Sequence, residues 1–227
     1  MVGTDLNFQC LAKVAPALQH TNIVAVYDYG QSNDQYFIIM EFVHGINLLY
    51  YLRSHGVLAI DQAVDIAHTI ALGLGAAHQQ SILHEDIKLQ NILIGHNGSI
   101  KLPDLGIANI YKEMSAQRKT SPNLDRIQYC APEQAQGKNV TPTTDVYALG
   151  VVMYEMLTGR SPFDGDTPVA VAMQHIQDLP TPPSQFNPNI PSALEEIILR
   201  CLEKMPETRF SDGVQLARAL ETWDETG

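Results

Sequence analysis

The chain has 227 residues, of which 45% are hydrophobic and 17% charged, and its formal net charge at pH 7 is −11. This composition is that of a soluble globular protein and excludes a disordered chain. The negative charge argues against a general nucleic-acid-binding protein, because such a protein needs basic residues to displace phosphate counterions.

The cysteines and the apolar segments indicate the compartment. Cys10, Cys130 and Cys201 are widely spaced and form no Cys-x-x-Cys pair, which is untypical of a disulfide framework or a zinc site. The longest apolar stretch, residues 146–157, is too short to span a bilayer, and the first residues lack the pattern of a signal peptide. We therefore expect a cytoplasmic protein without a membrane segment.

The first predicted elements in chain order are strands. Residues 23–29 and 36–40 are rich in β-branched and aromatic side chains, and residues 30–34 between them have the composition of a turn. This pattern predicts a β-hairpin. After Gly45 the strand pattern largely stops.

Apolar residues at helical spacing predict four helices further along the chain. The first starts at Asp61, and the second is strongly apolar, with Thr141 and Pro142 at its start and Gly159 just past its end. The other two cover residues 194–202 and 214–223. An irregular stretch between the first two helices, at residues 84–140, has short strand patterns at 91–94 and 99–102. A few strands followed by a mainly helical body predict an α+β fold.

The irregular stretch also carries the candidate site. Phosphoryl transfer requires a carboxylate that orients the attacking hydroxyl, magnesium ligands, and positive charge on the phosphate oxygens. In the segment His84-Glu85-Asp86-Ile87-Lys88-Leu89-Gln90-Asn91, Asp86 is the candidate catalytic base, Lys88 can reach the phosphate and Asn91 can bind a metal ion. Asp104, in Asp104-Leu105-Gly106, offers a second metal ligand. Each piece alone is weakly specific, but their order and spacing together are highly specific.

These residues give the chain its resemblance to Hanks-type (eukaryotic-like) Ser/Thr protein kinases of the bacterial branch, over essentially its whole length. The resemblance also rests on further segments, namely His20-Thr21-Asn22-Ile23-Val24, Tyr129-Cys130-Ala131-Pro132-Glu133-Gln134, Asp145-Val146-Tyr147-Ala148-Leu149-Gly150 and Pro206-Glu207-Thr208-Arg209-Phe210. It implies a protein-kinase-like fold with a mainly helical C-lobe at residues 44–227. Residues 1–43 are then an N-lobe remnant that contains the end of the regulatory helix, two strands and the hinge.

The resemblance implies ATP and magnesium as cofactors and a protein substrate. The implied nucleotide-binding residues are Met40, Glu41, Val43, Leu93, Asn91 and Asp104, of which Asn91 and Asp104 also bind the metal. The resemblance implies that Met40 is the gatekeeper and that the backbone of Glu41 and Val43 forms the adenine-binding hinge. It also implies that Leu93 packs beneath the adenine. Further implied roles are structural: Asp145 braces the catalytic loop, Glu133 pairs with Arg209, and Val26, His84 and Leu105 stack in a regulatory column.

The sequence departs from the family pattern in its N-lobe. It contains no Gly-x-Gly-x-x-Gly, and Lys13, the only lysine before the hinge, lies in the segment that resembles the regulatory helix. Gly73-Leu74-Gly75 lies inside a helical pattern, which predicts a close-packing site. We therefore expect a truncated N-lobe that lacks its first three strands. This predicts marginal stability, self-association or a partner that completes the sheet.

The catalytic core also departs from the pattern. Glu85 replaces the arginine that receives an activation-loop phosphate, so phosphorylation of Thr120 or Ser121 would not order the loop in that way. Asp125-Arg126 stands where the family usually has Gly-Thr, and the charge exchange suggests that Arg126 pairs with Glu85 or Asp86. Three alternatives remain open at this point: a kinase that is impaired on its own, a pseudokinase scaffold, and a remnant without an independent role.

Overall fold

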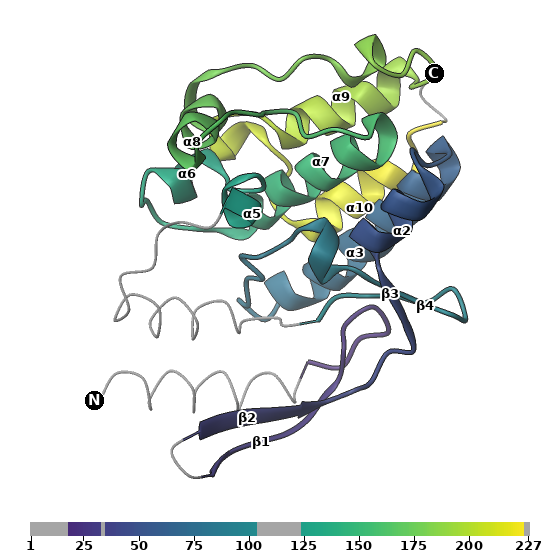
Figure 1. Cartoon of the computed structure of the whole chain (residues 1–227), viewed down its shortest axis with the longest axis vertical. Helices are drawn as coiled ribbons and strands as arrows, with labels where there is room; N and C mark the ends of the chain where they lie inside the picture. Colours follow the sequence, from purple (N-terminus) through teal and green to yellow (C-terminus); the bar gives the residue numbers. More distant parts are fainter. Residues whose placement is uncertain (1–17, 33–34, 104–123, 225–227) are drawn as a thin grey trace.

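The computed structural model describes residues 18–32, 35–103 and 124–224. A small β-hairpin lies at one end of the molecule and a larger helical body at the other, with a second small sheet between them (Figure 1). This is the α+β architecture that the sequence predicts, with a helical C-lobe and a reduced N-lobe sheet. The lobe boundary after residue 43 stays a prediction.

The hairpin consists of β1 (Val26–Ser32) and β2 (Gln35–Met40), which pair antiparallel. The predicted hairpin is therefore confirmed, but its first strand begins at Val26 rather than at residue 23. The reason is that the preceding residues bond to the body: the Val24 N–H donates to the Leu102 carbonyl at 2.9 Å, and the Leu102 N–H donates to the Asn22 carbonyl at 2.8 Å. These bonds tie the hairpin to the rest of the chain.

The second sheet has the order β3-β4-β5 and connects the hairpin to the helices. Its strands are β3 (Gly45–Asn47), β4 (Leu93–Gly95) and β5 (Ile100–Lys101). The strand patterns at 91–94 and 99–102 are thus confirmed as β4 and β5. Strand β3 was not predicted, because three residues are too few to show a period.

Four helices match the four predicted apolar patterns: α3 (Ile60–His78), α7 (Pro142–Thr158), α9 (Ser192–Cys201) and α10 (Gly213–Glu221). The other helical segments are α2 (Leu48–His55), α5 (Leu124–Ile127), α6 (Pro132–Ala135), α8 (Pro168–Gln177) and the 3₁₀ turns η2 (Leu89–Asn91), η3 (Pro183–Gln185) and η4 (Pro206–Thr208). None of the described helices is both long and apolar enough to cross a membrane.

Helix α7 is the central element of the helical body. All of its residues from Thr144 to Leu157 are buried, which is why its sequence is apolar almost all round. The helix begins after Thr141, whose N–H donates to Thr144 Oγ1 at 3.1 Å. It ends at Gly159, whose φ of 72° is the left-handed conformation that favours glycine. Both predicted ends are confirmed.

Helices α3 and α10 approach each other closely at two glycines. A Cβ atom on Gly213 would lie 2.5 Å from the Ala71 carbonyl oxygen, and one on Gly75 would lie 2.7 Å from a methyl group of Val214. Real side chains do not tolerate such contacts, so glycine is required at both positions. The close-packing role predicted for Gly73-Leu74-Gly75 is thereby confirmed.

Candidate active site

A buried carboxylate on α7 binds the backbone of the catalytic-loop segment. Asp145 accepts the His84 N–H on Oδ2 and the Glu85 N–H on Oδ1, each at 2.8 Å. His78 Nε2 lies 3.0 Å from Asp145 Oδ2, and His78 Nδ1 accepts the Gly213 N–H, so Nε2 carries the ring proton. Burial alone would raise the Asp145 pKa, but the hydrogen bond from His78 and its neighbours lower it. The bracing role implied for Asp145 matches this geometry.

Three of the four residues predicted to take part in the chemistry contact one another on this loop. The Asn91 side-chain amide donates to the Asp86 carbonyl at 2.9 Å and to Asp86 Oδ2 at 2.8 Å. Lys88 Nζ lies 3.0 Å from the same Oδ2. The tight turn η2 shortens the path between these side chains, which lets residues 86 and 91 share contacts. The fourth predicted residue, Asp104, lies outside the described residues.

The remaining oxygen of the Asp86 carboxylate contacts an arginine. Arg126 Nε donates to Asp86 Oδ1 at 3.1 Å, from the one-turn helix α5. The side chains of Arg126 and Asp86 are 37% and 23% exposed, so the pair lies at the edge of the site. Of the two partners suggested by the sequence, Asp86 is therefore confirmed as a contact of Arg126.

The segment expected to be the hinge is fixed by an ion pair. Glu41 Oε2 lies 2.7 Å from Lys101 Nζ and also accepts the Ala25 N–H at 3.2 Å. The hydrogen bond from Lys101 lowers the Glu41 pKa. The Glu41 N–H in turn donates to the Ala25 carbonyl at 2.8 Å. The contact between Glu41 and Lys101 does not follow from the sequence, since nothing local connects two residues that are 60 positions apart.

The other residues expected to surround a nucleotide lie around this ion pair. Met40 ends β2, Val43 lies in the segment that links the two sheets, and Leu93 begins β4; all three are half-buried. Leu93 pairs directly with Lys101 across β4 and β5. Through Lys101 and Glu41, the predicted adenine-binding segment and the strand that follows the catalytic loop are thus connected.

A buried ion pair joins α6 to the residue that follows η4. Arg209 binds Glu133 with two parallel hydrogen bonds, Nη1 to Oε1 at 2.9 Å and Nη2 to Oε2 at 2.8 Å. Thr144 Oγ1 also donates to Glu133 at 2.8 Å. Burial alone would raise the Glu133 pKa, but the hydrogen bonds from Arg209 outweigh it and the pKa is lowered. The implied pairing of Glu133 with Arg209 is confirmed.

A buried acid was not anticipated from the sequence. The Tyr129 hydroxyl donates to Glu155 Oε2 at 2.6 Å, and burial raises the pKa of Glu155 to about 7. The position of Glu155 on the apolar helix α7 was the available signal, because a buried carboxyl group requires a hydrogen-bond partner. Glu155 and Tyr129 line a cavity that also contains Gln90, the residue before Asn91.

Several predicted features fall outside the described residues, namely Cys10, Lys13, Asp104, Leu105, Thr120 and Ser121. Within the described part of the chain, Cys130 and Cys201 are not joined in a disulfide bond. No cluster of three or more His, Cys, Asp or Glu side chains that could hold a metal ion occurs in that same part.

Comparisons with known proteins find protein kinases. The family profile described as "Protein kinase domain" matches residues 10–222. The chain is 39% identical to the serine/threonine-protein kinase PrkC of Bacillus subtilis over 215 residues, which cover 95% of this chain and 33% of that protein. It is 40% identical to a probable serine/threonine-protein kinase of Clostridium acetobutylicum over 213 residues, covering 94% of this chain and 32% of that protein.

A third relative is the serine/threonine-protein kinase PknB of Mycobacterium leprae, 38% identical over 219 residues that cover 95% of this chain and 35% of that protein. The chain therefore spans about a third of the length of these curated relatives.

Proposed function

The chain belongs to the protein kinase domain family, and from that premise we propose that it transfers the γ-phosphoryl group of ATP to Ser or Thr hydroxyls of a protein, slowly on its own. One observation carries the proposal: the loop that contains Asp86 is anchored on the buried Asp145 through its two preceding residues, and Lys88 and Asn91 both lie within 3.0 Å of the Asp86 carboxylate. A cluster of this kind orients a hydroxyl and stabilises the charge of the transferring group.

Each residue has a separate role in this proposal. Asp86 accepts the hydrogen bond of the attacking hydroxyl, and Lys88 supplies positive charge to the phosphate oxygens. Asn91 donates from its amide nitrogen to Asp86, so its amide oxygen is the atom that would bind Mg²⁺, which prefers oxygen ligands. Asp104 is the proposed second ligand. Bound magnesium would neutralise the charge of the ATP phosphates.

The proposed adenine site lies at the Glu41–Lys101 ion pair. The Glu41 N–H is already used by the Ala25 carbonyl, so the Glu41 carbonyl and the backbone of Val43 are the groups proposed to bind the adenine edge. Met40 and Leu93 would then contact its faces. The ion pair fixes the hinge backbone before the nucleotide arrives, which reduces the ordering cost of binding.

A second candidate function is a pseudokinase scaffold that binds a protein partner without catalysis. One observation favours it: Arg126 contacts the carboxylate that a hydroxyl would need. A protein that completes the N-lobe sheet is the partner proposed for both functions, since β1 and β2 pair only with each other among the described residues.

Phosphate transfer and nucleotide binding separate the two candidates. The assay measures transfer of radiolabelled phosphate from ATP, with Mg²⁺ or Mn²⁺, to a generic basic protein and to the chain itself. We expect Asp86→Asn to reduce transfer by about 10²-fold or more, while the control Asp164→Asn, an exposed residue in the loop before α8, leaves it unchanged.

Nucleotide binding is measured in parallel as the shift in melting temperature with ATP and metal. A thermal shift without any transfer that depends on Asp86 would favour the scaffold. The absence of both would refute the kinase and leave the scaffold, which needs no nucleotide.

A further inference from the structure

The contact between Arg126 and Asp86 has a consequence for the reaction itself. Among the described residues, three side chains donate to the Asp86 carboxylate: Lys88 and Asn91 share Oδ2, and Arg126 Nε occupies Oδ1 at 3.1 Å. Lys88 and Asn91 lie on the same loop as Asp86. Arg126 comes from a different element, the one-turn helix α5.

A substrate hydroxyl must compete with this guanidinium. A general base must lie within about 2.6–3.2 Å of the hydroxyl whose proton it accepts. Oδ2 already accepts two hydrogen bonds, so Oδ1 is the oxygen with room for the hydroxyl. The hydrogen bond from Arg126 is charge-assisted, and such bonds are stronger than one from a neutral hydroxyl.

The exposure of the pair makes this obstruction reversible. The Arg126 side chain is 37% exposed and the Asp86 side chain 23%, so water screens their attraction and can take the place of either partner. Contacts of this kind exchange between paired and open states. The catalytic loop keeps its anchor on Asp145 in both states, because that anchor involves neither Asp86 Oδ1 nor Arg126.

We infer that Arg126 is a gate on the acceptor side of the site: it holds Asp86 Oδ1 when no substrate is present, and a protein substrate reacts only after Arg126 has moved away. This inference rests on the proposed function. It assigns the slow transfer proposed for the chain partly to Arg126. It also makes Arg126 a residue through which a partner could control the reaction by binding its guanidinium.

The test compares Arg126→Ala with Arg218→Ala, which removes an exposed arginine on α10 far along the chain. The measured quantity is the rate of phosphate transfer that is lost in Asp86→Asn, at saturating MgATP. We expect Arg126→Ala to raise that rate roughly 1.5- to fivefold, the range set by a partly exposed ion pair. Arg218→Ala should leave the rate unchanged, and Arg126→Lys, which keeps the charge but loses the Nε donor, should fall between.

A second readout distinguishes the gate from a general effect on nucleotide binding. The KM for ATP should stay the same in Arg126→Ala, because the gate acts on the hydroxyl and not on the hinge. A rate that falls or does not change in Arg126→Ala would overturn the inference while the proposed function stands. If no variant shows transfer that depends on Asp86, the proposed function fails, and the gate fails with it.

The contact is tested without turnover by a double-mutant cycle in urea. Arg126→Ala should shift the unfolding midpoint of the wild-type background more than that of the Asp86→Ala background. Equal shifts in the two backgrounds would show that the two side chains are not coupled, which would also overturn the inference.

Discussion

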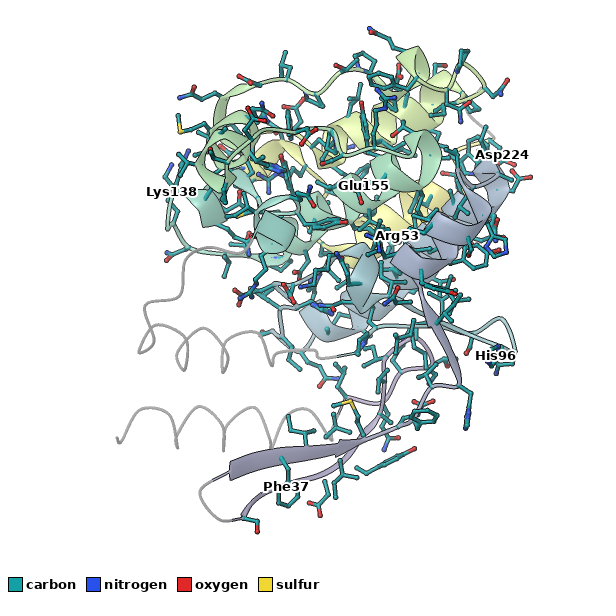
Figure 2. All side chains as sticks on the ribbon, in the orientation of Figure 1. Phe37, Arg53, His96, Lys138, Glu155 and Asp224 are labelled. Atoms are coloured by element: carbon teal, nitrogen blue, oxygen red, sulfur yellow. The ribbon has the colours of Figure 1, made fainter. Side chains whose placement is uncertain are left out.

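The helical body and the β1–β2 hairpin differ in the burial of their side chains. In the body, even charged groups are buried with partners, as Glu133 is with Arg209. On the hairpin, apolar side chains face solvent: Tyr27, Phe37 and Ile39 are 65%, 43% and 48% exposed. Figure 2 shows the same contrast, with Phe37 on the hairpin away from the body and Glu155 within the helices.

This difference shows which part of the molecule contains the hydrophobic core that stabilises the fold. The body encloses its own core around α7, whereas the hairpin is connected to it by a few backbone bonds near Val24 and by the Glu41–Lys101 pair. Regions with few buried contacts open at a lower free energy than the whole molecule. The catalytic loop belongs to the helical body, and the proposed adenine-binding segment lies between the body and the hairpin.

The largest expected effect comes from breaking the buried ion pair of the body. Arg209→Ala leaves the Glu133 carboxylate buried without its two strongest hydrogen bonds. We expect a loss of about 3–5 kcal/mol in the free energy of unfolding, measured by urea denaturation.

Arg200→Ala is the matched control for this substitution. Arg200 stacks over the ring of Phe210 at 4.3 Å but lies near the surface, so its removal should cost about 1 kcal/mol or less. Equal losses for the two arginines would contradict the view that the body depends on its buried charges.

The next effect is a pH dependence confined to the body. Burial raises the pKa of Glu155 to about 7, so the folded chain keeps a proton that the unfolded chain loses above about pH 4.5. The contribution of Glu155 to the free energy of unfolding therefore decreases as the pH rises from about 4.5 through 7, by at most about 1.4 kcal/mol per pH unit. Glu155→Gln keeps an acceptor for the Tyr129 hydroxyl and should remove this loss, as seen in urea midpoints at pH 5, 6, 7 and 8.

The pH dependence of stability that comes from His175 has the opposite sign. It is buried on α8 against Tyr147 and Phe163, and burial, together with the nearby charge of Lys204, lowers its pKa to about 3. The unfolded chain therefore binds the proton more readily, and stability from His175 is lost as the pH falls from about 6.5 toward 3. His175→Phe should flatten the acid side of the profile. If neither variant changes the profile, the two groups are not buried as described.

The smallest effect on stability is expected on the hairpin. The double substitution Tyr27→Thr and Ile39→Thr removes exposed apolar surface, so the free energy of unfolding should change by less than about 1 kcal/mol. Self-association, measured by sedimentation velocity, should decrease, because exposed apolar patches drive association. Leu179→Thr, which removes an even more exposed apolar residue from the body, should leave association unchanged.

A large loss of stability in the double variant would mean that the hairpin face is packed, and the contrast between the two regions would disappear. If association falls to the same extent in Leu179→Thr, the hairpin is not the surface through which copies meet.

The sequence by itself determined the local features of this protein. The helical spacing and the ends of α7 at Thr141 and Gly159, the hairpin, and the order of the catalytic-loop residues all follow from interactions over a few positions. The three-residue strand β3 and the helices α2 and α8 were missed, since their patterns are short or mixed. The same locality explains why Asp86, Lys88 and Asn91 could be named together, as they lie within a single loop.

Only the tertiary structure decided which distant side chains meet. It places Arg126 on Asp86 across 40 positions, Lys101 on Glu41 across 60, and the Tyr129 hydroxyl on the buried Glu155. A charge pattern in the sequence shows that a partner is needed but not which one, because the choice depends on how the helices and sheets pack. The gate proposed at Arg126 belongs to this second kind of information.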